Sequence, residues 1–468
     1  MATKRFRIEK DSLGEVKVPK GALWGAQTQR AVNNFPISGI KMDFPFTKSF
    51  VSSLGIIKDA AAKANLRLKL LPAKKAKAIS KAAKEVWQEK HHKEFPIDVF
   101  QTGSGTSSNM NANEVIANLA TKYAKTKISA NDDVNMSQSS NDVIPTAIKV
   151  SASMDLTKKL YPALDKLINE IEKKAQSVEG VIKTGRTHLM DAMPVDLSDE
   201  LRAWTSQLSS SRDMLGVIEQ RLLQLPQGGT AVGTGINAHK QFAKYFAQEM
   251  TKLSGNECKC VPSENFFHEL SAQDCSVQLS GELKNLAVVL MKISNDLRWM
   301  NSGPLAGLSE IELQALQPGS SIMPGKVNPV IPEAVAMASA DVIGNDVTIT
   351  VAAQAGNFQL NVMLPVIAYN LLKSINLLAG AMDVLSSKAI KTFKVNKKNL
   401  EASLARNPIL VTALNPIIGY EKAAEIAKKA YKEGRPIIEV ALEETDLSES
   451  RLKKLLDPAK LTKGGLSK

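Results

Sequence analysis

Four polar segments of the sequence contain glycines, hydroxyls and amides that the packing of a core does not require. They are Gly103–Asn109, Ser137–Asp142, Gly185–Leu189 and Gly319–Pro329. Among their small donors stand one histidine, His188, and one lysine, Lys326. Several neutral N–H and O–H groups beside a cation hold the oxygens of a carboxylate without supplying a nucleophile of the usual kind. The segments therefore predict a site for a carboxylate ligand.

The segment Gly319–Pro329 is the most informative of the four. Gly319 and Gly325 permit backbone angles at which consecutive N–H groups point toward one anion. Lys326 and Asn328 add a positive charge and an amide. A Gly-Ser-Ser stretch seen alone is usually a simple turn, but the longer motif favours an anion-binding loop.

Common catalytic signatures do not occur in the sequence: there is no G-x-S-x-G, no Walker loop, no G-x-G-x-x-G and no H-E-x-x-H. This disfavours hydrolases of that type, phosphate-loop NTPases, dinucleotide enzymes and zincins. Cys258, Cys260, His268 and Cys275 lack the paired C-x-x-C spacing of structural zinc sites. We therefore expect neither a metal nor a cofactor.

Long helices must position these segments, because apolar residues recur at alternating spacings of three and four. The strongest of these apolar seams is Leu279, Leu283, Leu286, Leu290, Ile293 and Leu297; three others run through Leu160–Ile171, Trp204–Leu225 and Leu364–Leu385. The helices also carry apolar residues off the seam, which one chain is unable to cover fully. A helical bundle with helices from other subunits follows.

Length and composition agree with a mainly α protein. The chain has 468 residues, of which 44% are hydrophobic and only 5% aromatic. We expect a mostly helical N-terminal domain with a small hairpin near Asp11 (1–138), a central domain of long helices (139–394) and a small helical C-terminal domain (395–468).

The net charge of +13 is compatible with nucleic acid, an anionic membrane surface or anionic small substrates. The densest basic stretch, Lys63–Lys93, is interleaved with apolar residues, which favours a solvated helical face over a nucleic-acid patch. The N-terminus has no apolar signal region, three cysteines suit a reducing compartment, and no apolar run approaches ~18 residues. We expect a cytoplasmic protein with neither a membrane nor a nucleic-acid partner.

The loop Gly319–Pro329 resembles the signature loop of the fumarase/aspartase superfamily. Further blocks resemble that family in its order: Gly103–Glu114, Ser137–Asp142, Gly185–His188 and Gly228–Gly235. Ser139-Ser140-Asn141 and Gly228-Gly229-Thr230 are similar to class II fumarases, where aspartases tend to carry Ser-Thr-Asn and Gly-Ala-Thr. The likeness runs from about Ile8 to beyond Leu442.

This resemblance implies a homotetramer that reversibly hydrates fumarate to (S)-malate, with three subunits building each site. It implies catalytic roles for Ser320 as base, for His188 oriented by Glu333, and for Lys326. It implies that the substrate dicarboxylate is held by Ser104, Gly105, Thr106, Ser139, Ser140, Asn141, Thr187, Ser321, Lys326, Val327 and Asn328.

One alternative function and one additional site stay open at this point. An aspartate ammonia-lyase of the same superfamily would share the fold and loop. An accessory dicarboxylate site at Asn131 and Asp132 is in doubt, because Ser129 and Ala130 stand where many class II fumarases have His-Pro.

Overall fold

The structure is a computed structural model that describes residues 6–42, 46–255 and 257–465. The chain begins with the expected hairpin, in which β1 (Phe6–Asp11) pairs antiparallel with β2 (Gly14–Pro19). The Asp11 carboxylate accepts the Leu13 N–H at 2.9 Å, and Gly14 has φ +109°, so the turn chemistry matches its sequence. The prediction of this hairpin is confirmed.

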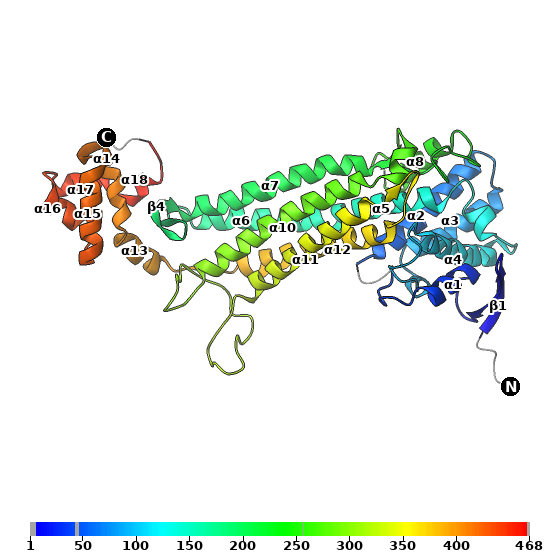
Figure 1. Cartoon of the computed structure of the whole chain (residues 1–468), viewed down its shortest axis with the longest axis horizontal. Coiled ribbons are helices and arrows are strands. Elements are labelled where there is room, and N and C mark those ends of the chain that lie inside the picture. The colour runs from blue at the N-terminus through cyan, green and yellow to red at the C-terminus, as the bar shows by residue number, and fades with distance from the viewer. Residues whose placement is uncertain (1–5, 43–45, 256, 466–468) are drawn as a thin grey trace. The chain divides into compact units, whose positions relative to one another are not determined.

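The fold is mainly helical, as expected (Figure 1). The longer helices are α2 (Lys48–Arg67), α3 (Ala73–Trp87), α4 (Thr106–Ala124), α5 (Ser140–Asp155), α6 (Tyr161–Ser177), α7 (Leu197–Leu222), α8 (Phe242–Leu253), α10 (Asp274–Met300), α11 (Val330–Ala353), α12 (Leu364–Leu385) and α15 (Tyr420–Glu433). The strands occur only as short pairs in the described part of the chain.

The apolar seams lie on helices and are buried. Leu279, Leu283 and Leu286 of α10 are fully buried, as are their seam partners Leu290, Ile293 and Leu297. The other three seams are buried too, with two differences at their ends: Leu160 lies in a π-type turn before α6, and Leu225 lies beyond the end of α7. Periodicity thus predicts the helices and their buried faces, whereas the boundaries shift by a few residues.

The described residues form two compact units. Unit 1 comprises those within Met1–Pro162, Ser211–Ala287 and Ala338–Ala379, and unit 2 those within Ala163–Ser210, Val288–Met337 and Gly380–Lys468. The long helices α7, α10, α11 and α12 contribute residues to both units. The three-domain boundaries expected from the sequence stay a prediction.

In unit 1, α2, α3 and α4 pack side by side (Figure 1). The basic stretch lies mostly on α3, whose residues Ala76, Ile79 and Ala83 are buried while Lys77 and Lys84 are exposed. This alternation at helical spacing is the solvated basic face expected from the sequence.

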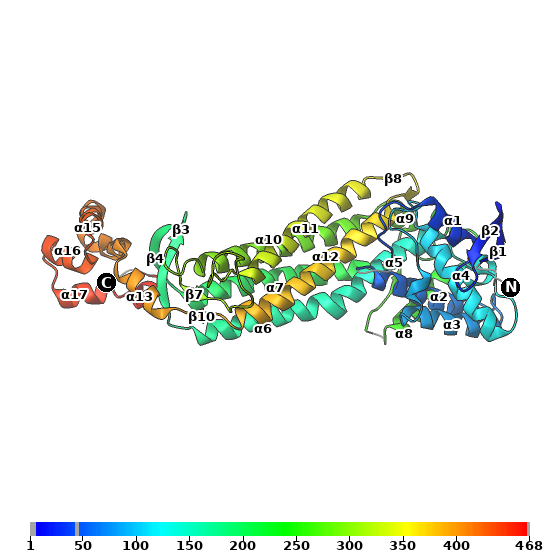
Figure 2. The ribbon, with the colours of Figure 1, turned by 90° about the horizontal axis from the view of Figure 1, so that it is seen from below.

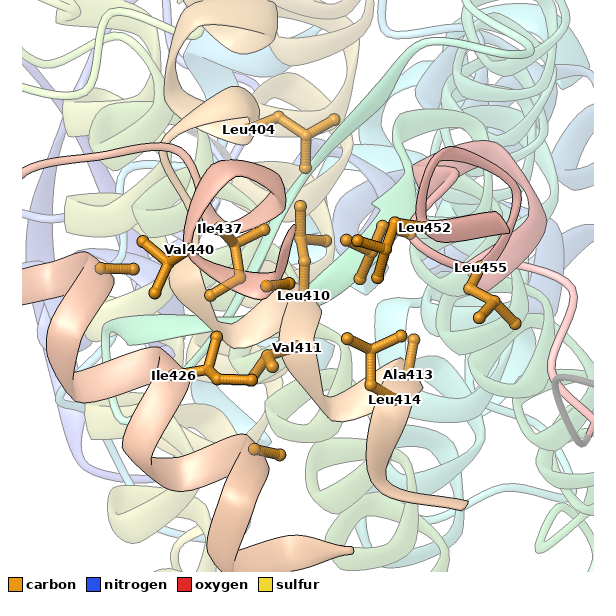
Figure 3. Packing of buried hydrophobic residues seen from close by; sticks show 14 residues of the cluster. Leu404, Leu410, Val411, Ala413, Leu414, Ile426, Ile437, Val440, Leu452 and Leu455 are labelled. Atoms are coloured by element: carbon orange, nitrogen blue, oxygen red, sulfur yellow. The ribbon is translucent and has the colours of Figure 1, made fainter. Parts of the chain in front are cut away.

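The C-terminal part of unit 2 has its own small core (Figure 3). Leu410, Val411 and Leu414 pack with Ile426 of α15 and with Val440 of α16 (Ile437–Glu444). The helix α15 ends on Gly434 at φ +63°, a left-handed cap that ends helices well in glycine and that the sequence predicts there.

Two helical stretches, Val330–Ala353 and Leu364–Ile390, are long and apolar enough to cross a membrane by length and composition alone. Core helices of soluble proteins pass the same test. Within the apolar window of the stretch Leu364–Ile390, 67% of the residues are buried in the chain. In the window of Val330–Ala353 only 33% are buried. The helix Val330–Ala353 therefore presents apolar side chains that a single chain leaves uncovered.

Candidate active site

The segment before α4 forms a glycine turn that leaves a helix N-terminus open. Gly105 has φ +72° and the Gln101 side chain accepts the Ser108 N–H at 3.0 Å, but among the described residues no side chain accepts the N–H groups of Thr106 and Ser107 at the start of α4. A helix N-terminus binds anions because its N–H groups lack intrahelical partners. Ser104 and Thr106 share a hydrogen bond of 2.8 Å between their hydroxyls at this end. Two hydroxyls thus stand beside an anion-binding helix end.

Gly103 fixes that turn against the segment that leads into α12. A Cβ on Gly103 would stand 1.7 Å from the carbonyl oxygen of Val362, and the Gly103 carbonyl accepts the Leu364 N–H at 3.0 Å. Only glycine allows this close approach. Packing alone therefore requires glycine at this position of the motif.

The segment Ser137–Asp142 leads into a second helix N-terminus. The Ser139 hydroxyl accepts the Asn141 N–H at 3.2 Å, and the Asp142 carboxylate accepts the Ser139 N–H at 2.9 Å, which is a capping box. The other oxygen of Asp142 accepts the N–H groups of Gly228 and Thr230 at 3.0 and 2.9 Å. One buried carboxylate thus joins two of the family-like blocks.

The two helix ends meet through one hydrogen bond, since the Asn109 amide donates to the Ser140 hydroxyl at 2.9 Å. Unit 1 therefore brings together six of the residues predicted to bind the substrate. They are Ser104, Gly105, Thr106, Ser139, Ser140 and Asn141.

His188 stands at the tip of a hairpin formed by β3 (Ile182–Thr187) and β4 (Met190–Asp196) in unit 2 (Figure 2). His188 and Leu189 have φ +56° and +60°, as a two-residue type I′ turn demands. A positive φ is uncommon for residues other than glycine and especially so for a leucine, and such strain collects at functional sites. Thr187, His188 and Leu189 are all exposed within one chain.

An ion-pair cluster that the sequence reasoning missed anchors this hairpin. Glu310 accepts from Lys183 and Arg186, both at 2.6 Å, and Lys183 also contacts Glu200 at 3.0 Å. Glu310 precedes the signature loop by nine residues, so it links the hairpin to the start of that segment. Arg186 lies inside a family-like block, which is the one signal that pointed to this cluster.

The signature loop folds around Ser320 in unit 2. The Ser320 hydroxyl oxygen accepts the N–H groups of Ile322 and Met323 at 3.2 and 3.0 Å. The loop is closed by Gly319 N–H to the Lys326 carbonyl at 2.8 Å and by the Asn328 amide to the Gly319 carbonyl at 2.7 Å. Two donated hydrogen bonds favour negative charge on the Ser320 oxygen.

A cavity of about 1300 Å³ lies beside the signature loop in unit 2. Lys326, Val327, Asn328 and Glu333 line it. Ser321 and Lys326 are exposed, and no ion pair of Lys326 occurs among the described residues. The lysine charge is therefore available to an anionic ligand.

The predicted pairing of His188 with Glu333 does not form within one chain. Neither side chain makes a hydrogen bond to another residue in the described ranges. This pairing, and the joining of the unit 1 residues with those of unit 2, stay predictions that involve further subunits.

The turn at Asn131 and Asp132 satisfies its own polar groups. The Ser129 hydroxyl contacts the Asp132 carboxylate at 2.8 Å and accepts the Asp132 N–H at 3.1 Å. Lys75 pairs with the neighbouring Asp133 at 2.8 Å. The accessory dicarboxylate site stays a prediction.

Comparisons with known proteins identify the family of the chain. A family model described as Lyase matches residues 14–344, and a model described as Fumarase C C-terminus matches residues 410–463. The chain is 59% identical to fumarate hydratase class II 2 of Pseudomonas aeruginosa, over 98% of this chain and 99% of that one. It is 47% identical to fumarate hydratase class II of Bacillus subtilis, over 98% and 99% of the two chains.

Solved structures give the same result. A class II fumarase from Schistosoma mansoni superposes with a TM-score of 0.94 at 37% identity and covers 98% of this chain and 99% of its own. The resemblance read from the motifs and the mainly α fold are both confirmed. The chain belongs to the lyase family of the class II fumarate hydratases.

Proposed function

We propose that this protein is a hydro-lyase that reversibly and stereospecifically hydrates fumarate to (S)-malate, a step of the citric acid cycle. The observation that carries the proposal is the pair of hydrogen bonds that the Ser320 oxygen accepts from backbone N–H groups, inside a loop that also supplies Lys326 and Asn328. Relatives named fumarate hydratase class II, at 46–59% identity, favour this over the ammonia-lyase.

The reaction from malate to fumarate begins at the weakly acidic C3–H bond of malate. Ser320, as an alkoxide, takes the C3 proton, and the electron pair moves into the adjacent carboxylate to give a doubly charged aci-carboxylate. Lys326, Asn328 and loop N–H groups stabilise this charge. The C2 hydroxyl then leaves with a proton as water, and the C2–C3 double bond of fumarate forms.

His188 assists the proton movement at the departing hydroxyl through a bound water. Glu333, at the start of α11, orients the His188 ring. Its place at a hairpin tip supports this role, because an exposed tip is able to reach a neighbouring subunit. The helix ends that carry Thr106 and Ser140 hold the substrate carboxylates.

The enzyme acts as a homotetramer in which three subunits build each site, and it resides in the cytoplasm. What supports the assembly is an apolar groove of about 590 Å³ in unit 1, lined by Val347 and Val351 of α11 together with Phe35, Ile37 and Val362. Exposed apolar surface of this kind marks a protein interface. A net charge of +13 also raises the local concentration of a dianionic substrate.

The test supplies (S)-malate or aspartate to the purified protein and follows the ultraviolet absorbance of the fumarate double bond. A rise with malate alone is expected. A rise with aspartate alone would keep the fold and loop assignments and move the activity to the ammonia-lyase branch.

A further inference from the structure

Lys58 of α2 is a fully buried lysine in unit 1 that the reaction scheme above does not use. Its ammonium donates to two amide oxygens, Asn135 Oδ1 at 3.0 Å and Gln138 Oε1 at 2.9 Å. The other strongly buried lysines, Lys149 and Lys183, instead contact carboxylates. In the described ranges Lys58 has no such ion pair, and burial lowers the pKa of Lys58 to about 7 even though Asp142 opposes the shift. A buried charge held only by amides is costly, so it calls for an explanation.

The two amides are oriented so that their oxygens face Lys58. The Asn135 Nδ2 donates to the Gln138 carbonyl at 3.1 Å, and the Gln138 Nε2 donates to the carbonyls of Val134 and Met136, both at 3.0 Å. Because carbonyls accept only, they fix which end of each amide points away from them. The turn that leads into α5 thus presents two acceptors to one ammonium.

Asn135 passes this arrangement on to the substrate end of α5. Its Oδ1 also accepts from Asn109 at 3.3 Å and from Asn113 at 3.2 Å. The Asn109 Nδ2 donates in addition to the Ser140 hydroxyl at 2.9 Å. A hydroxyl oxygen that accepts from an amide keeps its own proton for another acceptor. The orientation of Asn109 therefore makes Ser140 a donor, which is what a carboxylate ligand needs.

We propose that Lys58 is a positioning residue for substrate binding, which acts through Asn135 and Asn109 to hold Ser140 as a hydrogen-bond donor to a substrate carboxylate. The inference rests on the proposed function, since it takes Ser140 to contact the dicarboxylate. The protonated Lys58 also adds a positive charge to unit 1, and a positive potential favours a dianionic ligand. The carboxylate that faces Lys58 is Asp142, whose oxygens are bound by the N–H groups of Ser139, Gly228 and Thr230.

The test measures kcat and KM for (S)-malate in the tetrameric protein and in Lys58→Met, which keeps the length of the side chain without its charge. A contact made equally in the ground state and transition state changes KM and leaves kcat nearly unchanged. We expect KM to rise by about tenfold or more, the effect of losing a hydrogen bond to a charged group. Lys149→Met is the matched control, because it also removes a buried ammonium of unit 1, and its KM should stay at the wild-type value.

A double-mutant cycle with Ser140→Ala decides whether Lys58 acts through Ser140. If it does, Lys58→Met raises KM far less in the Ser140→Ala background than in the wild type. Asn109→Ala is the second variant if Lys58→Met does not fold, since it breaks the same path and keeps the ammonium; its KM should rise as well.

Three results would overturn the role of Lys58. They are a wild-type KM in a folded Lys58→Met or Asn109→Ala, an equal rise in Lys149→Met, and fully additive effects of Lys58→Met and Ser140→Ala. A wild-type protein that forms no fumarate from malate contradicts the proposed function instead, so the two failures are distinguishable.

Discussion

Ser320 is the residue on which the proposed chemistry depends most directly. Its oxygen receives two backbone N–H groups, and Ser320→Ala removes the oxygen while leaving the loop closure between Gly319 and Lys326 in place. A lost general base lowers kcat by about 10²- to 10⁴-fold. We expect such a loss in a steady-state assay with malate, while light scattering gives the same molar mass for the variant as for the wild type. Turnover near the wild-type rate would remove Ser320 as the base.

His188 offers a substitution that keeps its strained backbone. Asparagine tolerates the left-handed conformation that His188 adopts at φ +56°, so His188→Asn preserves the turn and removes the ring. We expect turnover to fall by about 10²-fold or more, as for a lost proton-transfer group. Leu189→Asn, at φ +60°, measures the cost of asparagine in the same turn. Equal rates in wild type and His188→Asn would leave His188 a structural role only.

Lys58 also makes stability depend on pH with a defined sign. Its pKa is about 7 in the folded chain and near 10.5 when unfolded, so between these values the unfolded chain binds more protons. The buried Lys58 ammonium destabilises the folded protein most below pH 7, and this penalty falls as the pH rises. Relative to Lys58→Met, the wild-type free energy of unfolding should gain about 1.4 kcal/mol per pH unit above pH 7. Urea unfolding of both proteins at pH 7, 8 and 9 and one protein concentration checks this; parallel pH profiles would contradict it.

At this scale the sequence identifies residues inside motifs and misses those that support them. Ser320, His188 and Thr106 stand in short polar segments with glycines, which is a local signal. Lys58 and Glu310 lie in ordinary helical or extended sequence, and their roles arise from partners 77 and 124 residues away along the chain. No local pattern encodes such contacts.

Among the elements, the turn before α4 depends on Gly103. A methyl group on Gly103 would collide with the Val362 backbone, which has no flexible end to move aside. Gly103→Ala should lower the free energy of unfolding by at least about 2 kcal/mol and reduce affinity for malate, because the α4 N-terminus shifts. Gly21→Ala is the control: a Cβ there meets nothing within 4 Å and its φ is ordinary. Thermal unfolding of both variants checks this, and equal melting temperatures would contradict it.

Helices are the elements that the sequence predicts best, because a seam such as Leu279–Leu297 repeats its signal over many turns. The hairpin of β3 and β4 was not predicted as strands. Its tip has His-Leu where the usual type I′ turn has Asn-Gly, so the local sequence signal for a hairpin turn is absent. The contact between the N-termini of α4 and α5 is equally hidden, since it depends on tertiary packing.

For the whole molecule, the final prediction concerns the apolar groove on α11. Val347 is 60% exposed in one chain, and a groove lined by valines is covered by a second subunit if the enzyme is a tetramer. Val347→Lys places a charge there, which costs little in a single chain but opposes burial. We expect a folded but dissociated protein by analytical ultracentrifugation, with activity lost because three subunits build each site in the proposed assembly. Tyr431→Lys, at a residue 82% exposed on α15, should remain tetrameric and active. An active, tetrameric Val347→Lys would show that the groove lies outside the subunit interfaces.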